Sequence, residues 1–263
     1  MDNDSTHHIL CVDFHLISYE DVFSTILDWR KNSKQHYIAL TPPYSVLMCY
    51  RDNALKKATK NASLTLPDGV GIILSAIILR YSHHGRVTGP SLMLKLCDFG
   101  RSEKLKHFFY GSTPDVINKL TEKLMHQYPE LDIVGSCCPP FHEPSLTEDI
   151  EIVRQINEAE PDIVWVGLGS PKQEKWMAEH INRIKATVMI GVGAAFDFHS
   201  GHKKWAPAWM RKLGFEWAYR LAQEPRRMWQ RNVGSFVFLV KILHQRVRGS
   251  YARRSAITLN KIE

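Results

Sequence analysis

The sequence predicts an α/β fold, with a mainly parallel sheet that has helices on both faces, followed by a C-terminal helical appendage. Apolar stretches of strand length alternate with patterned segments of helix length, and two of the stretches end in Gly-X-Gly. The C-terminal part of the chain then changes to continuous basic and aromatic sequence. Alternating strands and helices favour a parallel sheet, because each parallel connection needs a long crossover.

Six apolar stretches are the predicted strands: His36–Leu40, Ser63–Leu66, Lys106–Tyr110, Leu131–Val134, Ile163–Leu168 and Thr187–Val192. The segments between them predict helices, among which are Val70–Leu79, Pro114–Tyr128, Glu148–Ala159 and Pro171–Ile184. No strand pattern follows Glu216. We therefore expect residues 1–200 to form an α/β body and residues 201–263 to form a basic, Trp-rich appendage.

The composition is that of a soluble protein, with 44% hydrophobic and 23% charged residues among 263. No apolar run approaches the roughly 20 residues that span a bilayer. The first residues lack the basic and then apolar pattern of a secretory signal. Five cysteines, odd in number and without zinc-ligand or redox spacing, favour free thiols in a reducing compartment. We expect a cytoplasmic location.

Charge is distributed unevenly along the chain. Residues 201–263 carry 14 Lys and Arg against 3 Asp and Glu, whereas the other 200 residues carry 20 against 24. Four tryptophans also lie in this part: Trp205, Trp209, Trp217 and Trp229. Such a segment suits an anionic partner, which could be a membrane surface, a nucleic acid or a phosphorylated substrate. A solvated basic helix is the alternative interpretation of the charge alone.

Two glycine-rich corners predict a binding site. Glycines let a ligand approach the backbone, and a helix that starts there offers N–H donors to an anion. Pro171 is suited to the first helical turn and is followed directly by polar side chains. The residues concerned are Gly167, Gly169, Lys172, Gln173 and Glu174 at the first corner and Gly191 and Gly193 at the second. On its own, each motif is equally typical of a tight strand–helix turn.

Asp68 is the candidate reactive carboxylate. It follows the strand Ser63–Leu66 and precedes the helix Val70–Leu79, in the sequence Pro-Asp-Gly. Reactive groups of α/β proteins lie at the carboxyl ends of strands, although Asp-Gly is also common turn chemistry. Thr41 ends the strand His36–Leu40, so its hydroxyl is expected near Asp68 if the two strands are neighbours.

Basic residues of the appendage can bind a diphosphate. Arg220, Arg227 and Arg231 fall at helical spacing, and guanidinium groups match diphosphate oxygens as paired donors. The apolar run Ser235–Leu243 follows; it is too short to span a bilayer but suits a membrane interface, and core packing of a terminal helix is the alternative.

Other chemistries fit less well. Neither Gly-X-Gly completes a dinucleotide fingerprint, which weakens the alternative of an NAD-type oxidoreductase. His199 and His202 lack a third ligand, so we expect no metal site, and we expect no cofactor. A hydrolase elbow and an RNA-binding aromatic signature are both missing, so we expect no nucleic acid partner. A non-enzymatic membrane or nucleic-acid binding module remains the other alternative.

Eight sequence segments together resemble the WecG/TagA/CpsF family of bacterial glycosyltransferases. They are LTPPYSVL, LPDGVG, GRVTGPSLM, FFYGSTPDV, VGLGSPKQEKW, IGVGAAFDFHSG, WAPAWMRKLGFEWAYRL and EPRR. They occur in the family's order between about Ile38 and Arg231. This resemblance implies a Rossmann-like body and transfer, with inversion and without a metal, of a sugar from a UDP-sugar to a polyprenyl-diphosphate-linked saccharide. Such products are teichoic acid linkage units, capsules and exopolysaccharides.

The resemblance also implies residue roles. Asp68 corresponds to the family's catalytic base, Gln173 and Thr41 to pocket residues, and the arginines to an appendage that completes the site and touches the inner face of the cell membrane. Arg86 and Asp197, which lie in two of the matching segments, join the expected substrate-binding residues. Pro43 stands where the family usually has Asn, which leaves the sugar open between an N-acetylmannosamine type and a glucose type. A homo-oligomer also remains open.

Overall fold

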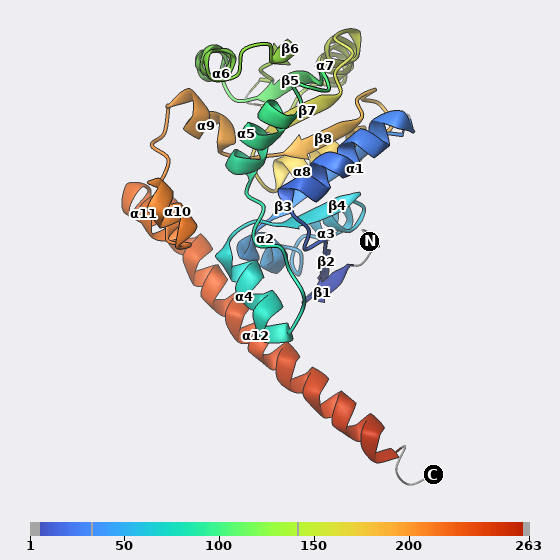
Figure 1. Cartoon of the computed structure of the whole chain (residues 1–263), viewed down its shortest axis with the longest axis vertical. Coiled ribbons are helices and arrows are strands. Elements are labelled where there is room, and N and C mark those ends of the chain that lie inside the picture. Colours follow the sequence, from blue (N-terminus) through green and yellow to red (C-terminus); the bar gives the residue numbers. More distant parts are fainter. Residues whose placement is uncertain (1–5, 33, 141, 260–263) are drawn as a thin grey trace.

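Figure 1 shows an α/β body with a long C-terminal helix that runs along it and extends beyond it. The computed structural model describes residues 6–259 apart from positions 33 and 141, and describes side chains as far as Arg248. The helices are α1 (Tyr19–Lys31), α2 (Pro43–Met48), α3 (Asn53–Lys60), α4 (Val70–Leu79), α5 (Gly89–Phe99), α6 (Pro114–Gln127), α7 (Leu146–Glu158), α8 (Lys172–His180), α9 (Ala195–Ser200), α10 (Ala208–Lys212), α11 (Glu216–Gln223) and α12 (Pro225–Leu259).

The main sheet has six strands in the order β4-β3-β8-β7-β5-β6, and every pair of neighbours is parallel. These strands are β3 (His36–Thr41), β4 (Leu64–Pro67), β5 (Lys106–Gly111), β6 (Asp132–Cys137), β7 (Ile163–Gly167) and β8 (Val188–Gly191). Each predicted apolar stretch overlaps one of them. The predicted parallel α/β fold is therefore confirmed.

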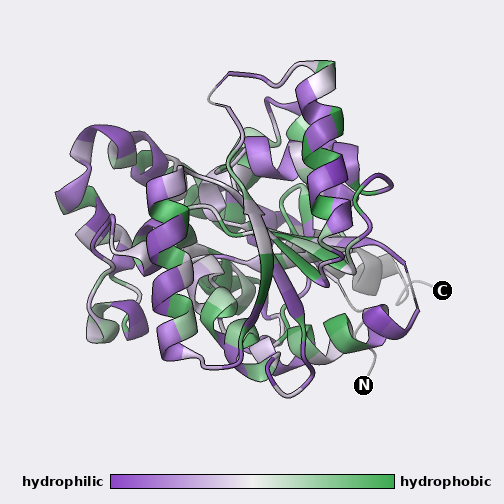
Figure 2. Cartoon of the chain, turned by 90° about the horizontal axis from the view of Figure 1, so that it is seen from above, coloured by the Kyte–Doolittle hydropathy of each residue, from purple (hydrophilic) through white to green (hydrophobic). Residues whose placement is uncertain are grey.

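Helices cover both faces of the sheet because successive strand side chains enter different cores. Ile38 and Phe109 pack in a core with side chains of α1, α5, α6 and α9. Their neighbours Tyr37 and Phe108 pack on the other face with side chains of α7 and α8. In Figure 2 the strands at the centre are largely apolar, whereas the surrounding helices alternate between hydrophilic and hydrophobic residues. This is the pattern expected of a doubly covered sheet.

A third core joins the two ends of the chain. The antiparallel hairpin of β1 (His7–Ile9) and β2 (Val12–Phe14) packs with α2, α3 and α4. Phe238 and Ile242 of α12 are fully buried in the same core. The side chain of Gln245 also accepts a hydrogen bond from the Leu10 amide at 2.9 Å. The sequence analysis did not predict this hairpin, because strands of three residues are too short to show alternation.

The buried position of Phe238 predicts that α12 stabilises the whole chain. Phe238→Ala is expected to lower the free energy of unfolding by about 3–5 kcal/mol, because a buried ring is lost and a cavity remains. Chemical denaturation would measure this change. Phe236→Ala is the matched control: the ring is 70% exposed, so a change under about 0.5 kcal/mol is expected. Equal effects of the two substitutions would contradict the packing.

Candidate active site

The candidate site lies at the carboxyl edge of four adjacent strands, β4, β3, β8 and β7. The segments that follow these strands carry Asp68, Pro42, Gly193 and Gly169, and all four residues line one cavity. Its volume is about 460 Å³. Side chains of α11 and α12 line the same cavity from the opposite side. Crevices of this kind, outside the carboxyl ends of parallel strands, are where open α/β sheets bind ligands.

Gln173 joins the two glycine corners. Its side-chain oxygen accepts hydrogen bonds from the amides of Gly169 at 3.1 Å and Gly193 at 3.0 Å. Gly191 lies directly beneath this side chain, since a Cβ at Gly191 would be 2.9 Å from Nε2 of Gln173. The amides of Gly169 and Gly193 thus fix the two corners to each other in this structure.

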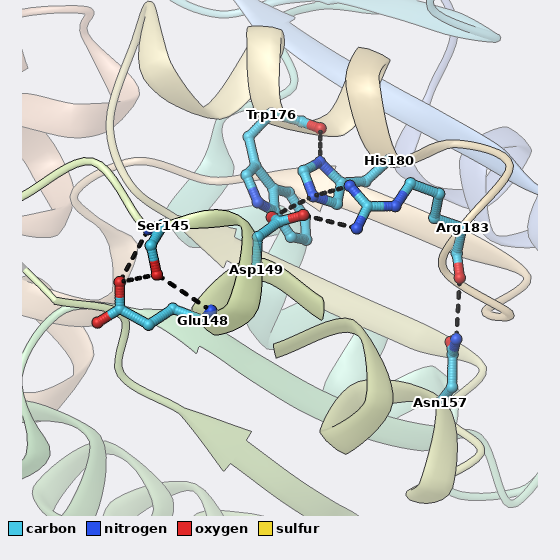
Figure 3. A network of polar contacts seen from close by, with 7 residues as sticks. All are labelled: Ser145, Glu148, Asp149, Asn157, Trp176, His180 and Arg183. Carbon is cyan, nitrogen blue, oxygen red and sulfur yellow. Dashed lines mark hydrogen bonds and ion pairs between the residues drawn. The ribbon is translucent and has the colours of Figure 1, made fainter. Parts of the chain in front are cut away.

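Helix α8, which carries Gln173, is anchored to α7 by the network in Figure 3. His180 hydrogen bonds through Nε2 to Asp149 at 2.8 Å and through Nδ1 to the Trp176 carbonyl at 2.8 Å. Arg183 forms an ion pair of 2.6 Å with the other carboxylate oxygen of Asp149. The amide of Asn157 donates to the Arg183 carbonyl at 2.8 Å. Because His180 and Asp149 are largely buried, these contacts fix α8 relative to α7.

Asp68 is held beside Thr41 by the parallel pairing of β4 with β3. Thr41 is the register partner of Pro67, and the amide of Asp68 approaches the Thr41 carbonyl at 3.4 Å. Burial raises the pKa of the Asp68 carboxyl to about 6, and the negative charge of Glu216 adds to this effect. The positive charges of Arg220 and Arg86 lower the pKa of this carboxyl. The carboxylate is therefore ionised at neutral pH, yet it is a stronger base than an ordinary aspartate.

The three predicted arginines meet in the cavity. Arg220, Arg227 and Arg231 all line it, although they come from two different helices. Burial and the positive charges of Arg227 and Arg220 lower the pKa of the Arg231 guanidinium. Mutual repulsion of this kind is relieved by a bound anion, so the cluster suits a phosphate-bearing ligand. Glu224 pairs with Arg227 at 3.3 Å.

Glu216 is a site residue that the sequence analysis did not single out. It lines the cavity at the first turn of α11, and its carboxylate lies 4.0 Å from the guanidinium of Arg86. Arg86 also donates a hydrogen bond to the Arg211 carbonyl, so it links the segment before α5 to the C-terminal part. The sequence did contain a signal that could have identified Glu216: it is one of only three acidic residues in the strongly basic segment 201–263.

The cavity therefore gathers most of the predicted site residues: Asp68, Arg86, Gly169, Gln173, Gly191, Gly193, Arg220, Arg227 and Arg231. The other predicted residues lie outside its lining: Thr41, Gly167, Lys172, Glu174 and Asp197.

Side-chain packing, ion pairing and solvent exposure account for the residues that do not line the cavity. Thr41 and Glu174 are only 2% exposed, and burial raises the pKa of the Glu174 carboxyl. A Cβ at Gly167 would lie 2.6 Å from the Phe196 ring, so this glycine permits close packing. Asp197 forms an ion pair with Lys203 at 3.1 Å. Lys172 is exposed to solvent.

Neither a metal cluster nor a membrane span is found in the described part of the chain. Within residues 6–259, apart from 33 and 141, no three His, Cys, Asp or Glu side chains are arranged to hold a metal ion. His199, one of the candidate ligands considered above, hydrogen bonds to the Pro90 carbonyl at 2.8 Å. In the same residues, no helix is long and apolar enough to cross a bilayer.

Fold and site together define an α/β enzyme class: a parallel sheet whose crevice combines a carboxylate of raised pKa with a cluster of arginines. Comparison with known proteins gives the family. Residues 7–252 match the glycosyl transferase WecG/TagA/CpsF family, so the chain belongs to this family. It is a glycosyltransferase, and the alternatives of an NAD-type oxidoreductase and a non-enzymatic binding module are set aside.

Individual relatives match along most of their length. The chain is 28% identical over 246 residues, 93% of each sequence, to an N-acetylglucosaminyldiphosphoundecaprenol N-acetyl-beta-D-mannosaminyltransferase of Bacillus subtilis. It is 29% identical over 222 residues to the Staphylococcus aureus (strain MW2) protein of the same name, covering 84% of this chain and 85% of that one.

The position of Glu216 predicts a measurable effect on Asp68. Glu216→Gln keeps the side chain's size but removes a negative charge that raises the pKa of Asp68, so this pKa is expected to fall below about 6. Carboxyl-carbon NMR titration would measure it. Glu224→Gln is the control, because Glu224 is not among the groups that shift Asp68. An unchanged or higher pKa in Glu216→Gln would contradict this electrostatic coupling.

Proposed function

We propose that this protein transfers a hexose from a UDP-sugar, with inversion and without a metal ion, to a saccharide carried on a polyprenyl diphosphate. The product would serve cell-surface polysaccharide synthesis. The observation that carries the proposal is the presence of Asp68 and the arginine cluster in one cavity. The relatives' printed names support the acceptor class, because they specify a diphosphoundecaprenol-linked saccharide. The donor remains either an N-acetylmannosamine type or a glucose type.

Asp68 is assigned the role of general base. The acceptor hydroxyl oxygen attacks C1 of the sugar, its proton passes to the Asp68 carboxylate, and the bond from C1 to the diphosphate oxygen breaks. A single displacement of this kind inverts the configuration at C1. A pKa of about 6 suits this role, since the group is ionised at neutral pH and still accepts a proton effectively.

The arginines are assigned to the diphosphates. UDP gains negative charge as it leaves, and guanidinium groups aimed at its oxygens stabilise the transition state. Arg220, Arg227 and Arg231 supply such donors from the protein itself, which is the reason for proposing metal-independent transfer. Gln173 is assigned to holding the two glycine corners around the donor.

A panel of UDP-hexoses offered with a short lipid-diphosphate saccharide, with and without a chelator, tests the function. We expect one donor to give a product that mass spectrometry detects and that persists in the chelator. Asp68→Asn is expected to keep UDP binding and to lose about 10²–10⁴-fold in rate. The wild-type rate should rise with pH through about 6, as Asp68 loses its proton.

Three results would contradict these assignments. Near-full turnover of Asp68→Asn would remove Asp68 from the role of base. Complete loss of transfer in the chelator would reject metal independence. The absence of transfer or hydrolysis with every UDP-sugar would reject the donor class.

We also propose that the segment 201–263 contacts the anionic inner face of the cell membrane. Its exposed aromatic side chains include Trp209 at 61%, Trp217 at 47% and Trp229 at 64%. Each basic residue near such a surface contributes about 1 kcal/mol to binding. A truncation before Ser235 would not test this membrane contact cleanly, because it also removes the buried Phe238 and Ile242 and so disrupts the core.

Point substitutions test the membrane contact. The double variant Trp209→Ser, Trp229→Ser is expected to reduce flotation with anionic liposomes severalfold, because exposed aromatic surface is lost without a change in the core. The control is Met125→Ser on α6, whose side chain is 54% exposed. If the double variant floats as the wild type does, the contact is assigned to the wrong surface.

A further inference from the structure

Helix α4 has no charged residue, yet several of its apolar side chains are exposed to solvent. Its sequence is VGIILSAIIL, and Val70, Leu74 and Ile77 are 43%, 40% and 56% exposed. A helix that is apolar on all sides is normally buried or placed against another apolar phase. Val70 and Leu74 are one helical turn apart on the same side of α4. This face of α4 therefore leaves apolar surface open to solvent, although Val70 also lies close to Gly214.

The same face of α4 lines the active-site cavity. The cavity lining includes an apolar set from three helices, which we call the α4–α12 groove: Met48 of α2, Val70 and Leu74 of α4, and Phe236 and Leu239 of α12. Helix α4 runs beside α12 in Figure 1. The groove belongs to the cavity that contains Asp68 and the arginines, so one continuous site has a charged end and an apolar end.

Packing of α12 against the body fixes this groove. Phe238 and Ile242 are fully buried in a core with Ile72 and Ala76 of α4. Gly234 lets α12 approach α2 closely, since a Cβ there would lie 2.8 Å from the Tyr44 ring. Phe236 and Leu239 flank Phe238 in sequence and line the cavity. The position of Leu239, which adjoins Phe238, is therefore set by buried contacts before any ligand binds, whereas the Phe236 side chain is 70% exposed.

We infer that the α4–α12 groove holds the first isoprenoid units of the lipid-linked acceptor, so that the protein itself binds the polyprenyl chain beside the diphosphate. This inference rests on the proposed function. The order of chemistry in the cavity matches such a molecule: Asp68 for the saccharide hydroxyl, the arginines for the diphosphate, and the groove for the isoprenoid chain. Binding is strengthened in proportion to the apolar surface that is covered in this way.

A bilayer contact would use the outer side of α12. Trp229, Val233, Val240 and Leu243 are 64%, 47%, 53% and 54% exposed and do not line the cavity. At 100° per residue, they lie on the side of α12 opposite to the buried Phe238, and Phe236, which is 70% exposed, lies on that same side. The groove residues instead share a cavity with the reactive carboxylate. Val70, Leu74 and Leu239 therefore carry the argument for an isoprenoid chain in the groove, and Phe236 lies where the groove meets the outer side of α12.

Binding of soluble isoprenyl diphosphates tests the groove without a membrane and without knowledge of the sugar. The probes are geranyl, farnesyl and geranylgeranyl diphosphate, kept below the concentrations at which they form micelles, with calorimetry as the readout. We expect Kd to fall by about tenfold or more from the shortest to the longest chain, because each added unit covers apolar groove surface. Leu74→Ser and Phe236→Ser should each remove most of this dependence while geranyl diphosphate still binds.

Val237→Ser is the matched control. Val237 adjoins Phe236, is 42% exposed and does not line the cavity, so chain-length dependence is expected to persist in this variant. Thermal unfolding of each variant checks that the fold is retained.

Two outcomes would overturn the groove while leaving the proposed function intact. One is binding that does not depend on chain length in the wild type. The other is full dependence in Leu74→Ser and Phe236→Ser together with weaker flotation on liposomes, which would assign these side chains to the bilayer. Failure of all three probes to bind would instead reject both the groove and the assignment of the arginines to the acceptor diphosphate, and would leave their assignment to the diphosphate of UDP intact.

Discussion

The hydrogen bonds of one amide group determine the shape of the site. The side-chain oxygen of Gln173 accepts from both Gly169 and Gly193, so the loops after β7 and β8 form one rigid wall. Its side-chain nitrogen donates to the buried carboxylate of Glu174 at 3.1 Å, which fixes the orientation of the amide. Buried polar groups with satisfied partners specify one geometry, because any other arrangement leaves an unpaired group. The wall of the cavity at the ends of β7 and β8 depends on this constraint.

The part of the cavity lined by Arg227 and Arg231 depends on the C-terminal helix. Because Phe238 and Ile242 are part of the core around the N-terminal hairpin, α12 has a fixed position over α2 and α4. The same helix carries Arg227 and Arg231 into the cavity. The packing of α12 against the N-terminal hairpin and the placement of the arginines in the cavity are therefore coupled. The buried contacts of Phe238 and Ile242 therefore help to decide where the cationic groups of α12 stand.

The charges of the site balance one another across the two parts of the chain. Asp68 comes from the sheet, whereas Glu216 and Arg220, which shift its pKa in opposite directions, come from α11. The Arg86 guanidinium lies between the two parts, near Glu216 and bonded to the Arg211 carbonyl. A carboxylate in such surroundings is tuned by groups distant in sequence, which is typical of sites where proton transfer occurs.

The sequence by itself determined the parallel α/β fold, the two glycine corners and Asp68 at a strand end, because apolar period and turn chemistry are local properties. It also indicated the arginines through their spacing. Only the tertiary structure decided that Gly167 and Glu174 lie behind the cavity, that Glu216 faces Asp68, and that α12 shares a core with the hairpin. These facts depend on strand order and helix packing between distant segments, and no local pattern encodes such contacts.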